Sequence, residues 1–465
     1  MISPVRNYRA TGKKKDVSNV VNSDWLRERL TPFIKTKEAD KVGIVFFRTA
    51  TQVSRFANSQ VHQHMSDEDQ LIYFRVLLDG RIGLASTNSI DEHNLKEAFK
   101  KAHAIAQIKL ENKEKKDILS FKPLKALADF YFPRTAHTSA LARTRLLREI
   151  FAEADDLKVR FSGNLYNGLT QLAVISPQGQ MNYQDYSFAG LKLIASSAGS
   201  SGYAAQADYN MESLKPKALA DTAIKKCLRG CKKIALKPSR YDVILEPAAV
   251  AELISWLNYI GFGAKSLFEE TSFLYNRAGE RITGESVNIY DCGNDKNTFI
   301  LPFDFEGAHR KKTYLIKKGI AQEPLCDSHY AKLLKLKSSG HANFPDDVDG
   351  PLGCNLVMEE GNLSENELIN SARQAILVTR FHYINGFLNT HRALMTGMTR
   401  DGTFLIKDGK IESAVKDMRF TESILEAFSR IKYISRERKL IADHLEALGS
   451  ICAPSIYIKD FNFTS

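Results

Sequence analysis

Histidine is the residue type that most often holds a catalytic metal, and the histidines of this chain are unfavourably spaced for that role. A single-metal hydrolytic site usually takes two histidines close in sequence, a third ligand and a carboxylate base. No two of the eleven histidines lie three, four or five positions apart. The sequence therefore contains no HExxH-like element, which argues against a metal site of that kind.

One close pair of histidines remains, His62 and His64 in the stretch QVHQHMSDEDQ. Residues two apart on a strand share a face, so the pair could bind a metal together with the acidic residues at 67–69. The alternative interpretation is a solvated strand end that leads into an acidic turn. We expect this second arrangement and keep a metal at His62 and His64 as the weaker alternative.

Signatures of a nucleophilic enzyme are also missing. The chain has no GxSxG, and AGSSG at 198–202 has the composition of a flexible Gly/Ser turn. GFGAKS at 261–266 imitates part of a phosphate-binding loop, but it follows an expected helix rather than a strand. We therefore expect Gly263 to cap the C-terminus of that helix.

A guanidinium group stands in the more distinctive stretch TGMTRDGTFLIKDG, at 396–409. The dipeptides Asp401-Gly402 and Asp408-Gly409 are turn signals and predict a strand with a tight turn at each end. Arg400 is then expected at a hairpin turn. It would either cap that turn or grip a carboxylate or the carbonyl groups of a peptide.

The composition is that of an ordinary globular protein. The chain has 465 residues, of which 43% are hydrophobic and 26% charged, so we expect two or three domains. Its purely apolar runs are short, as in VGIVFF at 42–47, against about 20 residues for a membrane helix. The N-terminal stretch is basic but has no apolar core, so it is not a secretory signal, and a cytoplasmic location is expected.

Cysteines and charge add two exclusions. The six cysteines are scattered and form no CxxC pair, which excludes a zinc ribbon and favours free thiols. The net charge is +11 and the pI is about 9.1, but the basic residues lie in small groups mixed with acids. Nucleic-acid binding is therefore not the favoured interpretation.

Strand and helix signals alternate in the first half of the chain. Apolar periodicity and capping residues predict four helices. A hairpin is expected over 70–87, with Asp79-Gly80 as its turn. The predicted helices cover residues 24–40, 91–110, 140–157 and 217–236.

The second half is richer in strand signals and is interrupted by two expected helices, at 248–260 and about 364–373. Ser364 and Glu367 have the spacing of a capping box. The fold class is therefore predicted to be α+β in two domains, an N-terminal one with hairpins and flanking helices and a C-terminal β-rich one. The expected divisions are a basic flexible N-terminus at 1–22, a first domain at 23–238 and a second at 239–465.

Several stretches, in order and spacing, resemble the TldD/PmbA family, also described as modulators of DNA gyrase. The match extends over nearly the whole chain. It rests on RFANSQVHQ (55–63), FRVLLDGRIGLAST (74–87), YDVILEPAAVAELISWL (241–257), LPFDFEGAHRKKTYLIKKGIA (301–321), CNLVMEEGNLSENELI (354–369) and APSIYIKDFNFTS (453–465).

The resemblance implies a zinc motif that this chain lacks. In the TldD branch, the helix after the VILEP-like strand carries HExxxH, and a cysteine in a Gly-rich C-terminal segment is a further ligand. Here both histidines are absent and Glu252 stands without them, while Cys452 lacks the Gly-rich setting. No zinc ligand can be carried over, and the helix keeps a broad apolar face suited to packing.

The chain therefore looks like the PmbA, or TldE, branch. This implies a non-catalytic subunit of a zinc peptidase that acts on small or unfolded peptides, with the zinc held by a TldD-type partner and no cofactor or catalytic residue in this chain. Arg400 and Tyr383 are the predicted substrate-facing residues, and self-association stays open. The alternatives are a stand-alone hydrolase with its metal at His62 and His64, or a binding protein for gyrase or nucleic acid.

Overall fold

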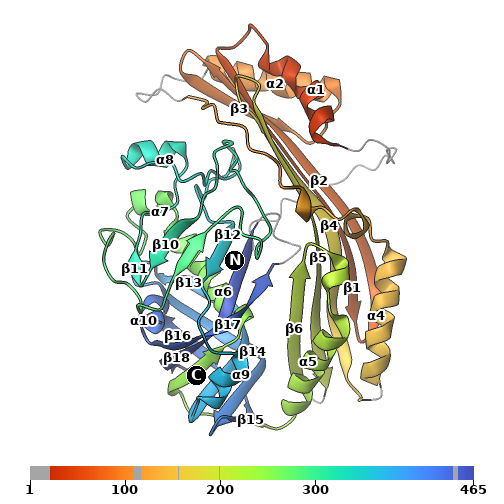
Figure 1. Cartoon of the computed structure of the whole chain (residues 1–465), viewed down its shortest axis with the longest axis vertical. Helices are drawn as coiled ribbons and strands as arrows, with labels where there is room; N and C mark the ends of the chain where they lie inside the picture. Colours follow the sequence, from red (N-terminus) through yellow and green to blue (C-terminus); the bar gives the residue numbers. More distant parts are fainter. Residues whose placement is uncertain (1–20, 109–116, 156, 198, 443–448) are drawn as a thin grey trace.

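The computed structural model describes residues 21–108, 117–155, 157–197, 199–442 and 449–465. Of the expected N-terminal segment 1–22, all but the last two residues lie outside this part. The described chain forms two halves, each built on its own β-sheet (Figure 1). The α+β class predicted from the sequence is confirmed.

The first sheet has six strands, all paired antiparallel in the order β3-β2-β1-β4-β5-β6. Its strands are β1 (Lys41–Ala57), β2 (Gln60–Leu78), β3 (Arg81–Thr87), β4 (Arg160–Ile175), β5 (Met181–Ser197) and β6 (Ser200–Asp208). The predicted turn at Asp79-Gly80 is confirmed, because both residues have positive φ, at 48° and 74°, as a two-residue hairpin turn of this kind requires.

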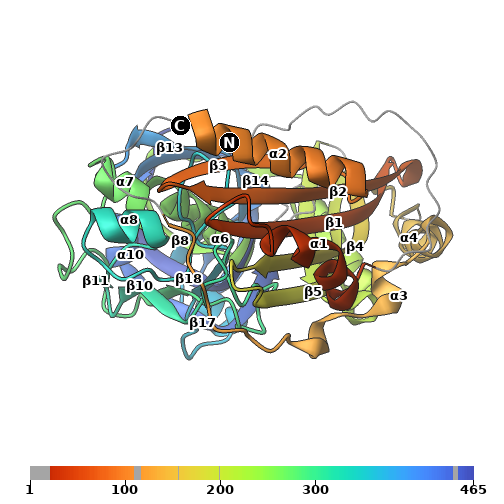
Figure 2. The same ribbon diagram turned by 90° about the horizontal axis from the view of Figure 1, so that it is seen from above.

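Helices cover this sheet in two groups, one towards each end; Figure 1 shows both groups, and Figure 2 shows the first from above. The first pair packs its apolar side on one end of the sheet around Phe74 and Phe99, and the second pair packs around Phe161 and Ile224. Each predicted helix exists, although all four end before the expected residue, and the first and the last of them end more than one turn early. The four are α1 (Ser23–Ile34), α2 (Glu92–Ile108), α4 (Ala140–Asp155) and α5 (Pro216–Arg229). Short turns lie at η1 (Ala128–Phe130), α3 (Pro133–Ala136) and η2 (Met211–Ser213).

The second sheet has twelve strands and mixes parallel with antiparallel pairs. Its strands are β7 (Lys233–Ile234), β8 (Ser239–Leu245), β9 (Ile289–Asp291), β10 (Thr313–Lys317), β11 (Ile320–Ala321), β12 (Asn355–Met358), β13 (Gln374–Asn389), β14 (Leu394–Lys407), β15 (Lys410–Val415), β16 (Arg419–Ser423), β17 (Ile431–Ile441) and β18 (Ser450–Phe463). The last strand, β18, pairs with β8, β12, β16 and β17, so it is the central member of the sheet. The predicted domain division near 238 falls between β7 and β8.

Helices of the second half are short. Three of them were not predicted from the sequence: α7 (Ala264–Phe268), α8 (Ser328–Leu333) and α10 (Ile424–Ser429). The predicted capping box is confirmed: the Ser364 hydroxyl accepts from the Glu367 N–H, and the Glu367 carboxylate accepts from the Ser364 N–H at 2.6 Å. The helices are α6 (Pro247–Leu257) with a π turn η3 (Asn258–Phe262), α7 (Ala264–Phe268), α8 (Ser328–Leu333), α9 (Glu365–Asn370) and α10 (Ile424–Ser429).

Two turn predictions in this half are wrong. Gly263 is extended, with φ −79° and ψ 144°, and joins the π turn to α7 instead of capping a helix in the left-handed conformation. Asp401 and Gly402 have positive φ but lie inside β14, where the pairing with β13 shifts register. They form a bulge, whereas Asp408-Gly409 forms the predicted turn.

The two halves meet through aromatic side chains. Phe299, from a loop of the second half, stacks on Tyr186 of β5 at 5.6 Å between ring centroids and contacts Tyr209 at 5.2 Å. The Tyr209 hydroxyl accepts from the Ile300 N–H at 2.7 Å. At the other end of the contact, Lys226 of α5 pairs with Glu246 at 2.5 Å.

Removing the Phe299 ring should loosen this junction. We expect Phe299→Ala to cost about 3 kcal/mol of folding free energy, since a buried ring and its aromatic contacts are lost. The melting temperature and the rate of limited proteolysis between the halves would measure this. The matched control is Phe268→Ala, whose ring is half exposed and should be nearly neutral.

Candidate functional site

Helix α6 of the second half carries a carboxylate, Glu252, on an otherwise mostly apolar helix. Pro247 occupies its first turn, where a missing N–H costs nothing, and Leu253, Ile254 and Leu257 are buried against the sheet. Glu252 lies on the opposite, outward side of the same helix. The helix therefore anchors this carboxylate on a rigid element.

The environment of Glu252 perturbs its charge. Its Oε2 accepts a hydrogen bond from the Phe381 N–H of β13 at 3.0 Å. Burial raises the pKa of Glu252 to about 7, against the opposing effects of Arg380 and the Phe381 N–H. A carboxyl group with this pKa exchanges its proton near neutral pH, as groups at functional sites often do.

Arg380 lies near Glu252 and contacts residues of both halves of the molecule. Its Nε donates to Asp401 Oδ2 at 2.9 Å, and its guanidinium lies over the Tyr203 ring of β6 at 4.9 Å from the centroid. The β14 bulge at Asp401 and Gly402 places the carboxylate opposite the arginine. We call Glu252, Arg380, Asp401 and Tyr203 the α6 cluster.

Three aromatic rings continue the surface of α6 beyond this cluster. The Phe387 ring lies 5.5 Å from Trp256 and 5.8 Å from Tyr259. Phe387 and Tyr259 are 46% and 42% exposed, although such rings are usually covered. Gly386 lets β13 cross Trp256, because a Cβ there would lie 2.5 Å from the indole.

The two residues predicted to face substrate lie near the α6 cluster. Arg400 is exposed. The prediction that it lies at a hairpin turn is wrong, because it lies inside β14, opposite Arg380 of β13. Tyr383 is 85% exposed and has φ +57°, an uncommon conformation for a tyrosine, where β13 shifts register. Burial lowers the pKa of His382, and the positive charges of Arg400 and Arg380 lower it further. A substrate contact of Arg400 or Tyr383 stays a prediction.

The histidine pair lies far along the chain from this cluster. His62 and His64 are exposed on β2, which runs unbroken through the acidic residues, so the expected acidic turn is wrong. Ser54 of β1 contacts His64 Nδ1 at 2.8 Å and also accepts from Arg143 at 2.7 Å. Because Arg143 lies beside Ser54, the surroundings of His64 disfavour a cation.

The zinc implied by the family resemblance does not fit the described residues. The outward side of α6 presents Ala248 and Ser255 beside Glu252, and neither is a usual zinc ligand. Cys452 is buried in β18, opposite Val357 of β12 and Leu440 of β17. No three His, Cys, Asp or Glu side chains in the described ranges are grouped closely enough to hold a metal ion.

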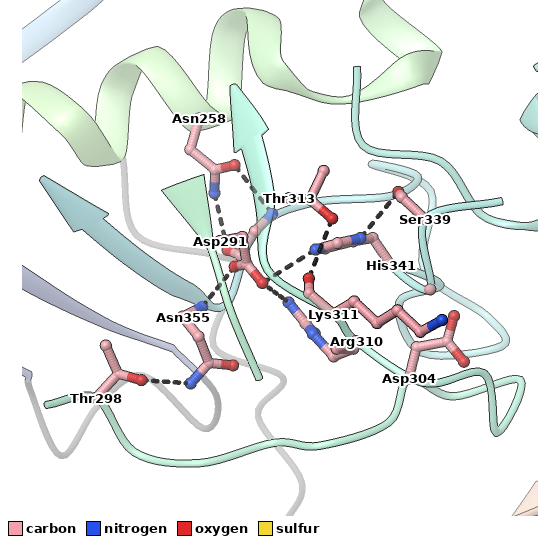
Figure 3. Close-up of polar contacts among 12 residues, drawn as sticks. Asn258, Asp291, Thr298, Asp304, Arg310, Lys311, Thr313, Ser339, His341 and Asn355 are labelled. Carbon is pink, nitrogen blue, oxygen red and sulfur yellow. Dashed lines mark hydrogen bonds and ion pairs between the residues drawn. The ribbon is translucent and has the colours of Figure 1, made fainter. Parts of the chain in front are cut away.

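A second polar cluster, which sequence analysis missed, lies buried around Asp291 (Figure 3). Asp291 Oδ1 lies 3.0 Å from Arg310 Nη2 and 3.0 Å from His341 Nε2, while Oδ2 accepts from the Asn355 N–H at 2.7 Å. Burial opposes the charge of Asp291, but Arg310 and His341 lower its pKa below the usual range. The stretches GAHRKK and SSGHA hold two of these residues, but no spacing rule joins them.

This cluster superficially resembles a Ser-His-Asp triad, because Ser339 Oγ lies 2.9 Å from His341 Nδ1. Three features make it structural. Arg310 already neutralises Asp291, the Ser339 hydroxyl accepts from the Cys326 N–H at 2.7 Å, and His341 is fully buried. A nucleophile needs an approach for substrate and a free proton acceptor, which this arrangement does not offer.

Comparison with known proteins identifies the family of the chain. Residues 238–465 match the profile of the PmbA/TldA metallopeptidase C-terminal domain, and residues 43–106 match PmbA/TldA metallopeptidase domain 1. The chain belongs to the PmbA/TldD family. The family resemblance stated from the sequence is thereby confirmed. No helix among the described residues is both long and apolar enough to span a bilayer.

The relatives of this PmbA/TldD chain have low sequence identity to it, but the similarity extends over most of each chain. A metalloprotease TldD homolog of Buchnera aphidicola is 24% identical over 82% of this chain and 82% of its own length. An uncharacterized protein of Methanocaldococcus jannaschii is 24% identical over 83% of this chain and 87% of its own. The crystal structure of TldE from Thermococcus kodakarensis superposes with a TM-score of 0.81 at 18% identity, covering 94% of this chain and 99% of that one.

The charge of Glu252 should make stability depend on pH. Its folded pKa of about 7 exceeds the ordinary value of 4.5, so the folded state loses stability as pH rises between these values. Glu252→Gln should therefore gain up to about 2–3 kcal/mol over wild type at pH 8, and nothing below pH 4.5. Urea denaturation across this range measures the difference.

The control for that experiment is Glu97→Gln on α2. A hydrogen bond to Lys100 lowers the pKa of this exposed carboxylate, so the substitution should change stability in the opposite direction. A Glu252→Gln difference that is constant with pH would contradict the charge assignment.

The Asp291 cluster should respond as a buried ion pair. Arg310→Met leaves Asp291 without its cation and should cost about 3–5 kcal/mol, whereas Ser339→Ala should cost about 1 kcal/mol. Free energies of unfolding from denaturant titration test both values. Equal costs for the two variants would show that Arg310 does not neutralise Asp291.

Proposed function

We propose that this PmbA/TldD family member is a TldE-like, non-catalytic subunit of a zinc metallopeptidase that acts on small or unfolded peptides. The observation that carries the proposal is the donor set of α6: a single carboxylate, Glu252, with no histidine or cysteine beside it. Such a helix cannot hold a divalent cation by itself. The zinc would be supplied by an HExxxH-bearing TldD-type partner, and the assembly would be cytoplasmic.

The α6 cluster supports a role in holding substrate. Peptide groups are recognised by paired hydrogen-bond donors and acceptors beside apolar surface. Glu252 and Arg380 provide charged groups of both signs, and the exposed rings of Tyr259 and Phe387 provide the apolar surface next to them. Arg400 of β14 lies opposite Arg380, and Tyr383 is exposed on β13 three residues after it, so both would contact an extended peptide.

The rival metal site at His62 and His64 gains no support from this geometry. Metal analysis of the purified chain is the direct check: stoichiometric zinc that is lost in His62→Ala/His64→Ala would revive the stand-alone hydrolase. No observation favours a gyrase or nucleic-acid role over the peptidase subunit.

Reconstitution tests the proposed function. Mixing the chain with a cognate HExxxH-bearing partner should give peptidase activity on unstructured peptides that neither protein shows alone, and a chelator should abolish it. Fluorogenic peptides measure the rate. Chelator-sensitive hydrolysis by this chain on its own would contradict the proposal.

Substitutions on this chain should then act through substrate. Arg400→Ala and Tyr383→Ala should raise the KM of the mixed assembly about 3- to 10-fold and leave kcat nearly unchanged, because uniform binding is lost. Arg27→Ala on α1 is the matched surface control. A loss of kcat at unchanged KM would point to a different role.

A further inference from the structure

Two exposed aromatic rings meet nearly at right angles beside α6. Tyr259 of η3 and Phe387 of β13 lie 5.8 Å apart between ring centroids, with an interplanar angle of 74°. Trp256 lies behind both, 6.2 Å from Tyr259 and 5.5 Å from Phe387. In the part of the chain that the structure describes, no lysine or arginine lies over these rings. We call Tyr259 and Phe387 the aromatic corner.

The loop at 346–353 borders the aromatic corner. Asn258, in the same π turn, donates from Nδ2 to the Gly353 carbonyl and accepts at Oδ1 from the Gly353 N–H, each at 3.0 Å. Lys265 Nζ donates to the Val348 carbonyl at 2.7 Å. These three hydrogen bonds hold the loop against the π turn and the start of α7.

Two acidic residues of this loop lie near the aromatic corner. Asp347 and Asp349 are both exposed. Burial raises the pKa of Tyr259, and the negative charges of Asp349 and Asp347 raise it further. Both carboxylates are therefore close enough to influence the Tyr259 hydroxyl. The face of an aromatic ring is itself electron-rich, so rings beside carboxylates attract a cation.

Elsewhere the chain fills a corner of this kind with its own lysine. The rings of Tyr290 and Tyr314 lie 5.6 Å apart at 64°. Lys312 Nζ lies 3.8 Å from the Tyr290 centroid, 4.8 Å from the Tyr314 centroid and 3.1 Å from Glu359 Oε1. Two rings at a steep angle and a carboxylate therefore hold a lysine ammonium group in this fold. The aromatic corner has nearly the same ring geometry and two carboxylates nearby.

We propose that the aromatic corner binds the side chain of a lysine in an extended substrate peptide, with Asp349 as its ion-pair partner. The methylene groups of the lysine pack on the rings while the ammonium group reaches the carboxylate. This inference rests on the proposed function, in which the surface of α6 holds substrate, and it names the substrate class as lysine-containing peptides.

One peptide can reach both the aromatic corner and the α6 cluster. Glu252 and Tyr259 are seven residues apart in one continuous helical segment, which is about 10 Å at 1.5 Å per residue. About three residues of an extended peptide span that distance. A peptide held by Glu252 and Arg380 therefore presents a side chain about three positions further on to the aromatic corner.

The fluorescence of Trp256 tests the proposal. The chain has two tryptophans, so Trp25→Phe leaves Trp256 as the only indole in the full-length protein. This protein is titrated with a short unstructured peptide that has one central lysine, and with the same peptide acetylated on that lysine. The lysine peptide should give a saturable change in emission. Acetylation should weaken binding about 5- to 20-fold, because the cation–π contact and the ion pair are lost.

Substitutions in the corner should remove this preference for lysine. Asp349→Asn should reduce it, and Tyr259→Leu/Phe387→Leu should abolish it. Asp221→Asn, which removes an exposed carboxylate on α5, is the matched control and should keep it. Anisotropy of a labelled peptide repeats the comparison on the chain that retains Trp25.

Three results would overturn the proposal. They are equal binding of the lysine and acetyl-lysine peptides, an undiminished preference in either corner variant, and no saturable response to any peptide. Reconstitution of peptidase activity is measured separately. A lysine preference without that activity would reject the peptidase role and keep the aromatic corner, whereas activity without a lysine preference would do the reverse.

Discussion

The second half of the molecule is organised around one buried charge, the carboxylate of Asp291. An isolated buried carboxylate is costly, so its partners must be in place before this region is stable. Arg310, His341 and Asn355 supply them from three segments that are distant in sequence. The loop between Asp291 and Arg310 also carries Phe299, which seats on the first sheet. The contacts that neutralise Asp291 therefore hold the surrounding loops in place, and with them the contact of Phe299 between the two halves.

Helix α6 combines an apolar inner side with a single carboxylate on its outer side. Its inner side is continuous with the apolar core, and its outer side keeps one carboxylate, Glu252, held by the Phe381 N–H and balanced by Arg380. The remaining outward positions of the helix are small or aromatic. The outward surface of α6 therefore offers polar and apolar contacts on a rigid element.

Local signals in the sequence were sufficient for much of the fold. Capping at Ser364 and the turns at Asp79-Gly80 and Asp408-Gly409 depend on neighbouring residues only, and each was predicted. The bulge at Asp401-Gly402 has the same dipeptide as a turn, but pairing with β13 overrides it. The Asp291 cluster could not be predicted, because its members meet only after the chain has closed. For the same reason, Arg400 was placed near the right strands but in the wrong local structure.

The central place of β18 has a consequence for synthesis of the protein. The first sheet is complete once β6 ends at Asp208, so that half can fold while translation continues. The second sheet cannot close until β18 has left the ribosome, because β8, β12, β16 and β17 all pair with it. Until then those strands expose unpaired edges and apolar faces, and the nascent second half is the stage at which chaperones would be most needed.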